Sequence, residues 1–483
     1  MQRKKTAVII GGGISGVTAA EELIKQGYTV KILEKEPRLG GKIYSPRELA
    51  TKSGVPELGA MVMTSNYPAV DAVVKYHIAV QPVLPCEVAP INQVIYGKST
   101  PSFCDQATYA MKLMWQNIQF SRQVWSYNAA IHHLASSPPK GQSDSFDQFC
   151  KKLGLDSIAR FEKIWVPGMG YGDLKHNPAY RIIYYMGYST IPTLALGTTS
   201  LTPYLFTVPN GYQSIVEKIA EHMDVETSVH ITCIKRNPKK GVTVYYTNEQ
   251  AEDVHIDADY VVLTMSPYYW PDLNMQLTPT EQRCIRELKR VPYSTAVVDI
   301  EGYGGKQLFV PEALNAKGFG HIGFISTKGE GRCVVYINRD PTDDKFSLAE
   351  GAPGRQTMLD DLKKLGYDKV NILKTQDWPD YNATIPWELG MTLEKEQGKN
   401  GTLYVGSFRP TSFESVAAAE ESARATILRF LHIEKSYYET MRKQTVRALQ
   451  FFFKLPTMEI KPALVDTNKE QPLPPSVDLK SGW

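Results

Sequence analysis

The fold of this chain is decided close to its N-terminus, by the stretch Ala7-Val8-Ile9-Ile10-Gly11-Gly12-Gly13-Ile14-Ser15-Gly16. Its first four residues have the β-branched composition of a strand buried on both faces, and the glycines follow with the spacing G-x-G-x-x-G. Residues 17–26 have a helical pattern closed by Gly27, and residues 29–33 form a second apolar run that ends at Glu34. The segment therefore predicts a complete β-α-β unit, the first part of an α/β fold with a parallel sheet.

The glycine spacing is typical of a turn that binds a dinucleotide. Gly11 permits a tight turn, Gly13 lets the backbone approach a pyrophosphate, and Gly16 lets the helix pack closely on the strand. The first N–H groups of the helix, near Ile14 and Ser15, would face the phosphates, because the partial positive charge there favours an anion. We predict a Rossmann-type dinucleotide-binding domain; a glycine-rich turn without a ligand is the alternative.

The residues after the second strand indicate which dinucleotide binds. Glu34 can accept hydrogen bonds from ribose hydroxyls, and Lys35 and Arg38-Leu39-Gly40-Gly41-Lys42 follow it. Glu57-Leu58-Gly59-Ala60-Met61-Val62 comes next. With these motifs the chain resembles the flavin amine-oxidase superfamily, whose members have a G-G-R motif after the ribose acid and a glycine-containing segment against the flavin. The resemblance implies FAD in contact with Lys35, Gly41, Lys42, Gly59, Ala60, Met61 and Val62.

The resemblance continues toward the C-terminal end. Residues 228–234 look like the strand whose backbone holds adenine, with Ile231 as the contact, and residues 259–264 look like the returning strand. Residues 403–419 look like the C-terminal flavin motif, which implies contacts from Gly406, Ser407, Ser415 and Val416. The N-terminus of the last helix would face the pyrimidine ring and stabilise negative charge on reduced flavin. No His or Cys stands in a recognised flavin-attachment motif, so we expect non-covalent FAD.

The FAD domain of this superfamily is discontinuous. The resemblance implies an FAD-binding domain made of residues 1–75, 205–270 and 390–432, with an inserted α+β substrate domain made of residues 76–204 and 271–389. Residues 433–483 are expected to form a C-terminal helix and an extended tail. Inside the inserted region, residues 112–133 and 146–161 have helical patterns, and the stripe Met111, Met114 and Ile118 is predicted to belong to the core.

Within the superfamily, the chain is most similar to the bacterial polyenoic (linoleic) fatty acid isomerases. The matching features are Gly40-Gly41-Lys42 with Lys in place of Arg, Ser45-Pro46, Phe146-Asp147-Gln148-Phe149, Gly170-Tyr171-Gly172 and Phe413-Glu414-Ser415-Val416. In that family FAD takes a hydride from an allylic carbon and returns it to another carbon, so that a double bond migrates. The resemblance implies an apolar, lipid-like substrate, with Tyr171 and Phe413 as walls of its pocket.

Three departures from the family patterns bear on the reaction. Residues 293–298 contain no lysine, although amine oxidases have one near flavin N5 on the corresponding strand. The superfamily's Gly-Glu before the last helix is Gly406-Ser407 here, and no Lys or Arg stands between Lys75 and Lys98, where the isomerases hold the fatty-acid carboxylate. The missing lysine disfavours an amine oxidase, and the lack of a cation between Lys75 and Lys98 leaves a neutral or differently anchored lipid-like or aromatic substrate open. We expect hydride abstraction with isomerisation or desaturation. The alternatives are an oxygen-using oxidase of amines or amino acids and a non-catalytic flavoprotein.

Composition excludes several other classes. The 483 residues carry a net charge of +3 and no nucleic-acid-binding motif. The six cysteines are far apart and the histidines lack ligand spacing, which predicts buried free thiols and no metal site. No apolar run is long enough to span a membrane. The apolar run from Thr6 to Ile10 is too short for a signal peptide and ends in three glycines, so we expect a cytoplasmic protein. The partner that the resemblance implies is a small apolar molecule. Residues 434–456 are basic and amphipathic; they predict a packed terminal helix or, alternatively, an interfacial membrane helix.

Overall fold

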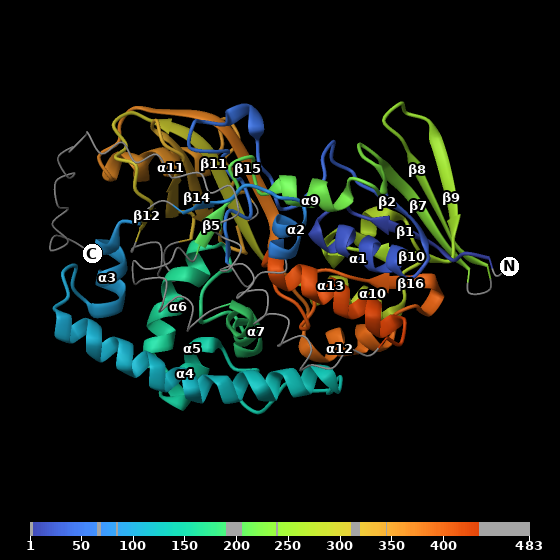
Figure 1. Cartoon of the computed structure of the whole chain (residues 1–483), viewed down its shortest axis with the longest axis horizontal. Helices are drawn as coiled ribbons and strands as arrows, with labels where there is room; N and C mark the ends of the chain where they lie inside the picture. The colour runs from blue at the N-terminus through green and yellow to red at the C-terminus, as the bar shows by residue number, and fades with distance from the viewer. Residues whose placement is uncertain are drawn as a thin grey trace.

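The structure is a computed structural model that describes residues 3–64, 69–83, 86–189, 205–237, 240–310, 319–343 and 345–433. Its first sheet is parallel, with the strand order β16-β10-β1-β2-β6 (Figure 1). The strands are β1 (Thr6–Ile10), β2 (Thr29–Leu33), β6 (Asp224–Glu226), β10 (Tyr260–Leu263) and β16 (Thr402–Tyr404). The other strands of this sheet therefore come from three separate parts of the chain, namely residues 29–33, 224–263 and 402–404.

Both faces of the parallel sheet are covered, which explains the continuous apolar composition of its strands. Ala7 and Ile9 face α1 (Ile14–Lys25), α9 (Gln213–Ala220) and α13 (Val416–Phe430). Val8 and Ile10 face an antiparallel sheet formed by β7 (His230–Asn237), β8 (Gly241–Thr247) and β9 (Asp253–Ala258). Alternate residues point to opposite faces, so each strand contributes to both cores.

A second large sheet is antiparallel, with the order β12-β13-β14-β11-β15. It contains β11 (Lys289–Ile300), β12 (Leu308–Phe309), β13 (Ile322–Thr327), β14 (Arg332–Asn338) and β15 (Val370–Thr384). One face packs on α11 (Pro353–Lys364), and the other meets the helical layer. That layer consists of α3 (Val88–Tyr96), α4 (Phe103–His132), α5 (Phe146–Leu153), α6 (Asp156–Gly168) and α7 (Ala179–Ser189).

Smaller elements complete the arrangement. A three-stranded sheet has the order β3-β5-β4, with β3 (Met63–Thr64), β4 (Gln81–Pro82) and β5 (Leu205–Thr207). The remaining α-helices of the described ranges are α2 (Ala69–Lys75), α10 (Pro279–Arg286) and α12 (Trp387–Lys395). None of the helices that the structure describes combines the length and apolarity needed to cross a bilayer.

The five-stranded antiparallel sheet binds the segment that precedes Gly59. The carbonyl oxygen of Leu58 accepts hydrogen bonds from Thr295 Oγ1 at 3.0 Å and from Trp378 Nε1 at 2.8 Å. The hydroxyl of Tyr336 donates to the carbonyl oxygen of Glu57 at 2.8 Å. Since β11, β14 and β15 supply these donors, the second sheet positions residues 57–60 beside the first.

The predicted α/β class and the opening β-α-β unit are confirmed, and β2 has the predicted bounds. The pattern over 146–161 is divided into α5 and α6, because Gly154 ends α5 with a left-handed φ of +66°. The placement of Met111, Met114 and Ile118 in the core is wrong: all three are exposed on α4. Cys104 is also exposed, whereas Cys150, Cys284 and Cys333 are buried free thiols. The domain boundaries stay a prediction, and residues 434–483 lie outside the described residues.

Candidate functional site

A cavity of about 980 Å³ lies at the carboxyl ends of β1, β2 and β10 and extends to β15. Its walls come from the glycine turn, the loop after β2, the start of β7, the loop after β10, the second half of β15 and the start of α13. This edge of an open parallel sheet is where such folds bind ligands. The sheet order brings together segments from both ends of the chain, so the cavity exists only in the folded protein.

The glycine turn between β1 and α1 has no room for side chains. Gly11 has a φ of +108°, and a Cβ atom there would lie 2.4 Å from Thr264 Oγ1. A Cβ atom on Gly16 would lie 2.0 Å from the carbonyl oxygen of Gly11. No side chain caps α1, which begins after Gly13, so its first N–H groups are left for an anionic ligand. The turn therefore fits a pyrophosphate.

Glu34 lies beside this turn at the end of β2. Its side chain is 5% exposed and lines the cavity. Oε2 accepts a hydrogen bond from the Gly12 N–H at 2.6 Å, and Oε1 accepts one from the Glu36 N–H at 2.9 Å. Burial raises the pKa of Glu34, and the two backbone hydrogen bonds oppose that rise. The carboxylate is thus held in one orientation at the carboxyl end of β2, and its role as ribose acceptor stays a prediction.

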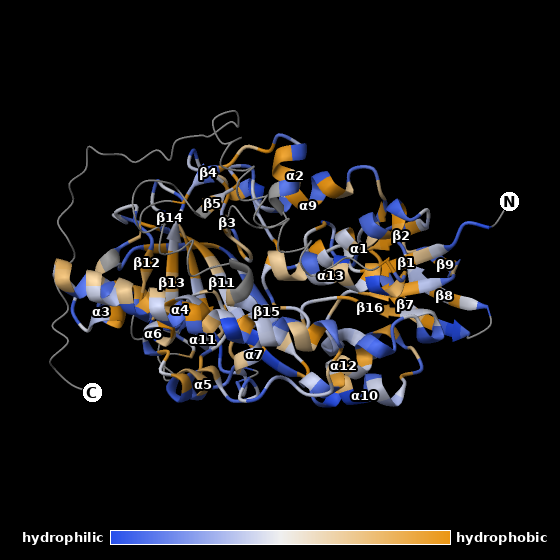
Figure 2. Cartoon of the chain, turned by 60° about the horizontal axis from the view of Figure 1, so that its bottom comes forward, coloured by the Kyte–Doolittle hydropathy of each residue, from blue (hydrophilic) through white to orange (hydrophobic). Residues whose placement is uncertain are grey.

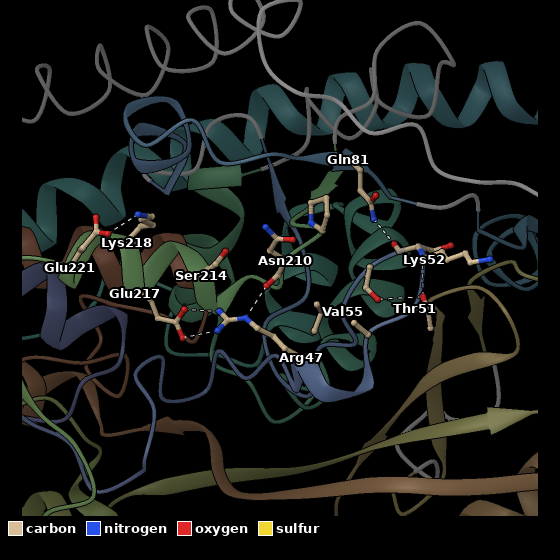
Figure 3. Close-up of a pocket in the computed structure, with 14 residues that line it drawn as sticks. Arg47, Thr51, Lys52, Val55, Gln81, Asn210, Ser214, Glu217, Lys218 and Glu221 are labelled. Carbon is tan, nitrogen blue, oxygen red and sulfur yellow. Dashed lines mark hydrogen bonds and ion pairs between the residues drawn. The ribbon is translucent and has the colours of Figure 1, made fainter.

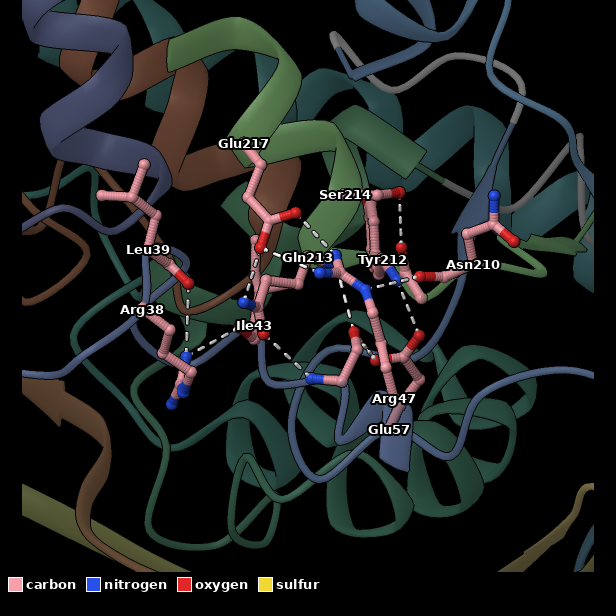
Figure 4. A network of polar contacts seen from close by, with 12 residues as sticks. Arg38, Leu39, Ile43, Arg47, Glu57, Asn210, Tyr212, Gln213, Ser214 and Glu217 are labelled. Carbon is pink, nitrogen blue, oxygen red and sulfur yellow. Dashed lines mark hydrogen bonds and ion pairs between the residues drawn. The ribbon is translucent and has the colours of Figure 1, made fainter. Parts of the chain in front are cut away.

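Arg38 holds the loop after β2 in shape (Figure 4). Its guanidinium lies 3.9 Å from the ring centroid of Tyr44 and donates to the carbonyl oxygens of Leu39, Gly41 and Ile43. Gly40 and Gly41 have φ angles of +115° and +56°. Gly40 also donates its N–H to the carbonyl oxygen of Gly12 at 3.0 Å. The loop therefore closes directly over the glycine turn.

Lys42 is the centre of an ion cluster at the cavity wall. Its Nζ lies 3.2 Å from Glu414 Oε1 and 3.6 Å from Asp380 Oδ2, and it donates to the carbonyl oxygens of Asp380 and Tyr381 at 2.7 and 3.1 Å. Ser407 Oγ donates to Glu414. Burial acts to lower the pKa of Lys42, but the Asp380 and Glu414 carboxylates outweigh it and hold that pKa above its ordinary value. Burial raises the pKa of Glu414 despite the attraction of Lys42.

Asp380 and Glu414 are not among the residues that the sequence predicts for the site. For Glu414 a signal exists, because an acid directly before the N-cap of the last helix stands near the predicted flavin contacts Ser415 and Val416. For Asp380 no local signal exists, since it lies in the irregular middle of a long strand that pairs with β11. Both line the cavity.

The N-terminus of α13 also faces the cavity. Ser415 is its N-cap and accepts a hydrogen bond from the Ala418 N–H at 3.3 Å, and Val416 is the first helical residue. Ser15 Oγ donates to the carbonyl oxygen of Ala419 at 3.4 Å, which joins the starts of α1 and α13. The two helix N-termini therefore place two partial positive charges on one cavity.

The far end of the cavity is aromatic. Tyr381 and Trp378 line it. Tyr171 packs 6.3 Å from Tyr381 and 4.8 Å from Phe413, measured between ring centroids. Neither Tyr171 nor Phe413 lines this cavity, so the two residues form a buried layer behind Tyr381. Their predicted role as pocket walls stays a prediction.

Most of the predicted flavin contacts line the cavity, and the others lie behind its wall or face another cavity. The residues that line the cavity are Gly11, Gly13, Ile14, Ser15, Glu34, Lys35, Gly41, Lys42, Ala60, Ile231, Ser407, Ser415 and Val416. Gly16, Gly59 and Gly406 lie behind its wall, where Cβ atoms would collide with the backbone of Gly11, Lys42 and Thr264. Met61 and Val62 instead face a separate small cavity beside Lys328. Burial lowers the pKa of that lysine, against the attraction of Glu57.

A second cleft, of about 880 Å³, shares no lining residue with this site. Figure 3 shows the residues that line the second cleft. Arg47 and Glu217 form an ion pair at 2.6 Å on its wall. Near them, buried Glu57 accepts hydrogen bonds from Ser45 Oγ at 2.6 Å and from the Tyr212 N–H at 2.8 Å (Figure 4). Burial raises the pKa of Glu57. The second cleft contains none of the predicted flavin contacts.

Solved structures with the same architecture include a fatty acid isomerase and an amine oxidase. The crystal structure of a CLA-producing fatty acid isomerase from P. acnes superimposes with a TM-score of 0.69, at 19% identity, and covers 89% of this chain and 99% of that one. Cyclohexylamine oxidase from Brevibacterium oxydans IH-35A has a TM-score of 0.60 at 16% identity, with 89% and 100% coverage. At these identities the likeness shows the fold.

Sequence comparison gives the family. L-amino-acid oxidase from Mus musculus is 38% identical over 65 residues, 14% of this chain and 10% of that protein. The chain covers only 7% and 24% of the lengths of two other curated relatives, a lysine-specific histone demethylase 1 homolog from Arabidopsis thaliana and a probable UDP-galactopyranose mutase from Klebsiella pneumoniae. The sequence pattern of flavin-containing amine oxidoreductases matches residues 14–346. The chain therefore belongs to the flavin-containing amine oxidoreductase family, and the cofactor of that family is a flavin.

Proposed function

We propose that this protein is an FAD-dependent enzyme that moves a hydride from a carbon of an apolar, polyunsaturated lipid-like substrate to flavin N5, with double-bond migration or desaturation as the outcome. The observation that carries the proposal is the buried aromatic end of the cavity. Tyr381 lines it, and Tyr293 packs 4.7 Å from Tyr381 between ring centroids. Burial raises the pKa of both phenols, so they stay neutral and offer no base near neutral pH. An aromatic surface without a titrating phenol suits hydride transfer, for which the flavin supplies the chemistry.

The extent of the cavity supports FAD. Its walls run from Ile231 on β7, past the glycine turn, to Ala60 and Trp378. This is the order in which an adenine, a pyrophosphate and a flavin ring would be bound. No cysteine lines the cavity, and His230 lies beside Ile231 at the adenine end. These facts support non-covalent attachment, which acid precipitation would test: FAD should be released into the supernatant and identified by its mass.

Glu414 is proposed to bind the ribityl chain in place of the acid missing after Gly406. Ser407 stands at the position of that acid and donates to the Glu414 carboxylate. Lys42 offsets the charge of Glu414 at 3.2 Å. Because both oxygens of Glu414 are held on the cavity wall, the carboxylate is oriented before the cofactor binds.

The alternative is an oxygen-using amine or amino-acid oxidase. The likeness to cyclohexylamine oxidase and to an L-amino-acid oxidase favours it. The absence of lysine in residues 293–298 disfavours it.

One experiment separates the proposals. The purified yellow protein is incubated aerobically with linoleate and other polyunsaturated lipids, and in parallel with amines and amino acids. A conjugated diene of unchanged mass is the expected product of isomerisation, and loss of two hydrogens would indicate desaturation. Hydrogen peroxide formed with an amine, and no lipid product, would overturn the proposal in favour of the oxidase. A cytoplasmic location is also proposed, and fractionation of the source cells would test it.

A further inference from the structure

The long helix α4 has apolar side chains on two opposite faces. Leu113, Phe120 and Tyr127 are buried, and the helix packs on α6 and α7. We define the outer face of α4 as Phe103, Met111, Met114, Trp115 and Ile118, whose exposed fractions lie between 58% and 83%. At about 100° per residue, positions 111, 114, 115 and 118 share one side of the helix, opposite 113 and 120. Figure 2 shows α4 on the near side of the molecule, with hydrophobic residues along it.

The outer face is a fixed surface. Gln116 Oε1 accepts hydrogen bonds from the N–H groups of Ser157 and Ile158 at 2.9 and 3.2 Å, at the start of α6. Its Nε2 donates to Asp156 Oδ1 at 2.7 Å. A capping box between Ser102 and Asp105 fixes the first turn of α4. The helix cannot rotate to bury its outer face without breaking these contacts.

Two of the three charged residues of α4 are basic. Lys112 and Arg122 are exposed and form no ion pair with any residue in the described ranges. Asp105 is the one acid of the helix sequence, and it is paired with Lys98 at 2.6 Å. The outer face therefore combines large apolar side chains, including a tryptophan, with unpaired cations and no unpaired acid.

We propose that the outer face of α4 docks on a lipid bilayer that contains anionic lipids. Trp, Phe, Met and Ile side chains on one face of a surface helix enter the headgroup–acyl boundary, and Lys and Arg beside them attract anionic headgroups. A patch of this kind on a soluble domain marks an interaction site. The inference does not depend on the proposed reaction or on residues 434–456.

The same charges disfavour a second copy of the chain as the occupant. Two outer faces packed together would bring Lys112 and Arg122 of both copies into one interface, and the helix offers no free carboxylate to pair with them. Like charges brought together in an interface are costly. A bilayer surface leaves both cations in the hydrated headgroup layer.

The test uses the full-length protein and large unilamellar vesicles of phosphatidylglycerol and phosphatidylcholine, compared with vesicles of phosphatidylcholine alone. Co-sedimentation should be stronger with the anionic vesicles and should weaken with added salt. The double variant Met114→Gln/Ile118→Gln should lower the partition coefficient roughly tenfold or more. Lys112→Gln/Arg122→Gln should lower it by about tenfold on anionic vesicles and little on neutral ones.

The matched control is Ile24→Gln/Leu153→Gln, which alters two apolar side chains that are each 41% exposed and lie outside α4. Far-UV circular dichroism and thermal unfolding establish that each variant is folded. Unchanged binding of the control supports the proposal. Failure of the wild type to bind anionic vesicles, or equal binding by Met114→Gln/Ile118→Gln, would overturn it. A dimer in light scattering that this variant dissociates, without vesicle binding, would assign the face to a second copy instead.

Discussion

Lys42 Nζ lies 3.2 Å from Glu414 Oε1 and so joins the loop after β2 to the residue that precedes the N-cap of α13. The two residues come from opposite ends of the chain, and Asp380 of β15 completes the group. The side chain of Lys42 is 26% exposed, whereas that of Asp380 is only 3% exposed. The cluster therefore links the parallel sheet and the sheet that contains β15 to the start of α13, on the wall of the cavity.

Lys42→Met should destabilise the protein, because it leaves the buried Asp380 carboxylate and the largely buried Glu414 carboxylate without their cation. We expect a loss of about 3 kcal/mol in the free energy of unfolding, the lower end of the range for breaking a buried ion pair. Urea unfolding of the cofactor-free protein at neutral pH measures it. Lys52→Met, at an exposed lysine, is the control and should stay within about 0.5 kcal/mol of the wild type. A Lys42→Met protein as stable as the control would contradict the role of the cluster.

Glu414→Gln should weaken flavin binding. The substitution removes the charged acceptor that Ser407 and Lys42 orient. Because a hydrogen bond to a charged group contributes about 1.5–3 kcal/mol, the dissociation constant for FAD should rise about tenfold to a hundredfold. Equilibrium dialysis against FAD measures it. Glu388→Gln, at an exposed position on α12, should leave the constant unchanged. An equal constant for both variants would show that Glu414 does not contact the cofactor.

Gly16→Ala should impair folding and flavin uptake. The added Cβ would lie 2.0 Å from the carbonyl oxygen of Gly11, so α1 must move away from β1. Overpacking of this kind costs about 1–3 kcal/mol. Gly304→Ala is the matched control, because its Cβ would meet no atom within 4 Å. Thermal unfolding and the flavin absorbance of the purified proteins report both effects, and a yellow Gly16→Ala protein of normal stability would refute the close approach.

Glu162 should make stability fall as the pH rises. It is buried in α6, neither carboxylate oxygen has a hydrogen-bond partner among the described residues, and burial raises its pKa to about 8. Below pH 4.5 both the folded and the unfolded states are protonated. Between pH 4.5 and about 8 only the folded state keeps the proton, so stability declines by up to about 1.4 kcal/mol per pH unit and is then constant.

Glu162→Gln removes this titration. Urea unfolding from pH 5 to pH 9 should therefore show a flatter dependence for the variant than for the wild type, with the largest stabilisation at pH 9. Glu388→Gln again serves as the exposed control. Parallel curves for the wild type and Glu162→Gln would contradict a protonated, buried Glu162.

Local sequence predicts much of the nucleotide-binding half. The β-α-β unit depends on residues that are neighbours in the chain. Positions 11 and 16 have no room for a side chain, so the glycine spacing is visible in the sequence. Residues such as Glu34 and Val416 are placed by the ends of predicted elements, and both line the cavity. The flavin family follows from these motifs in order along the chain.

Helix α4 shows what the local sequence pattern could not predict. Met111, Met114 and Ile118 have the spacing of a core stripe, as do Leu113 and Phe120 on the opposite side of α4. Helical periodicity shows that a face is apolar and does not show which apolar face meets another element. The packing of α6 and α7 on one side selects the inner face and leaves the other in solvent.

The sequence by itself determined the opening β-α-β unit, because that unit depends on residues close together in the chain, and it indicated the flavin family through short motifs that occur in order along the chain. Only the tertiary structure decided that Glu414 and Asp380 surround Lys42, and that an apolar face of α4 is exposed. Those relationships depend on strand order and helix packing, which bring residues that are distant in the chain into contact. The residue spacing within one segment does not indicate such contacts.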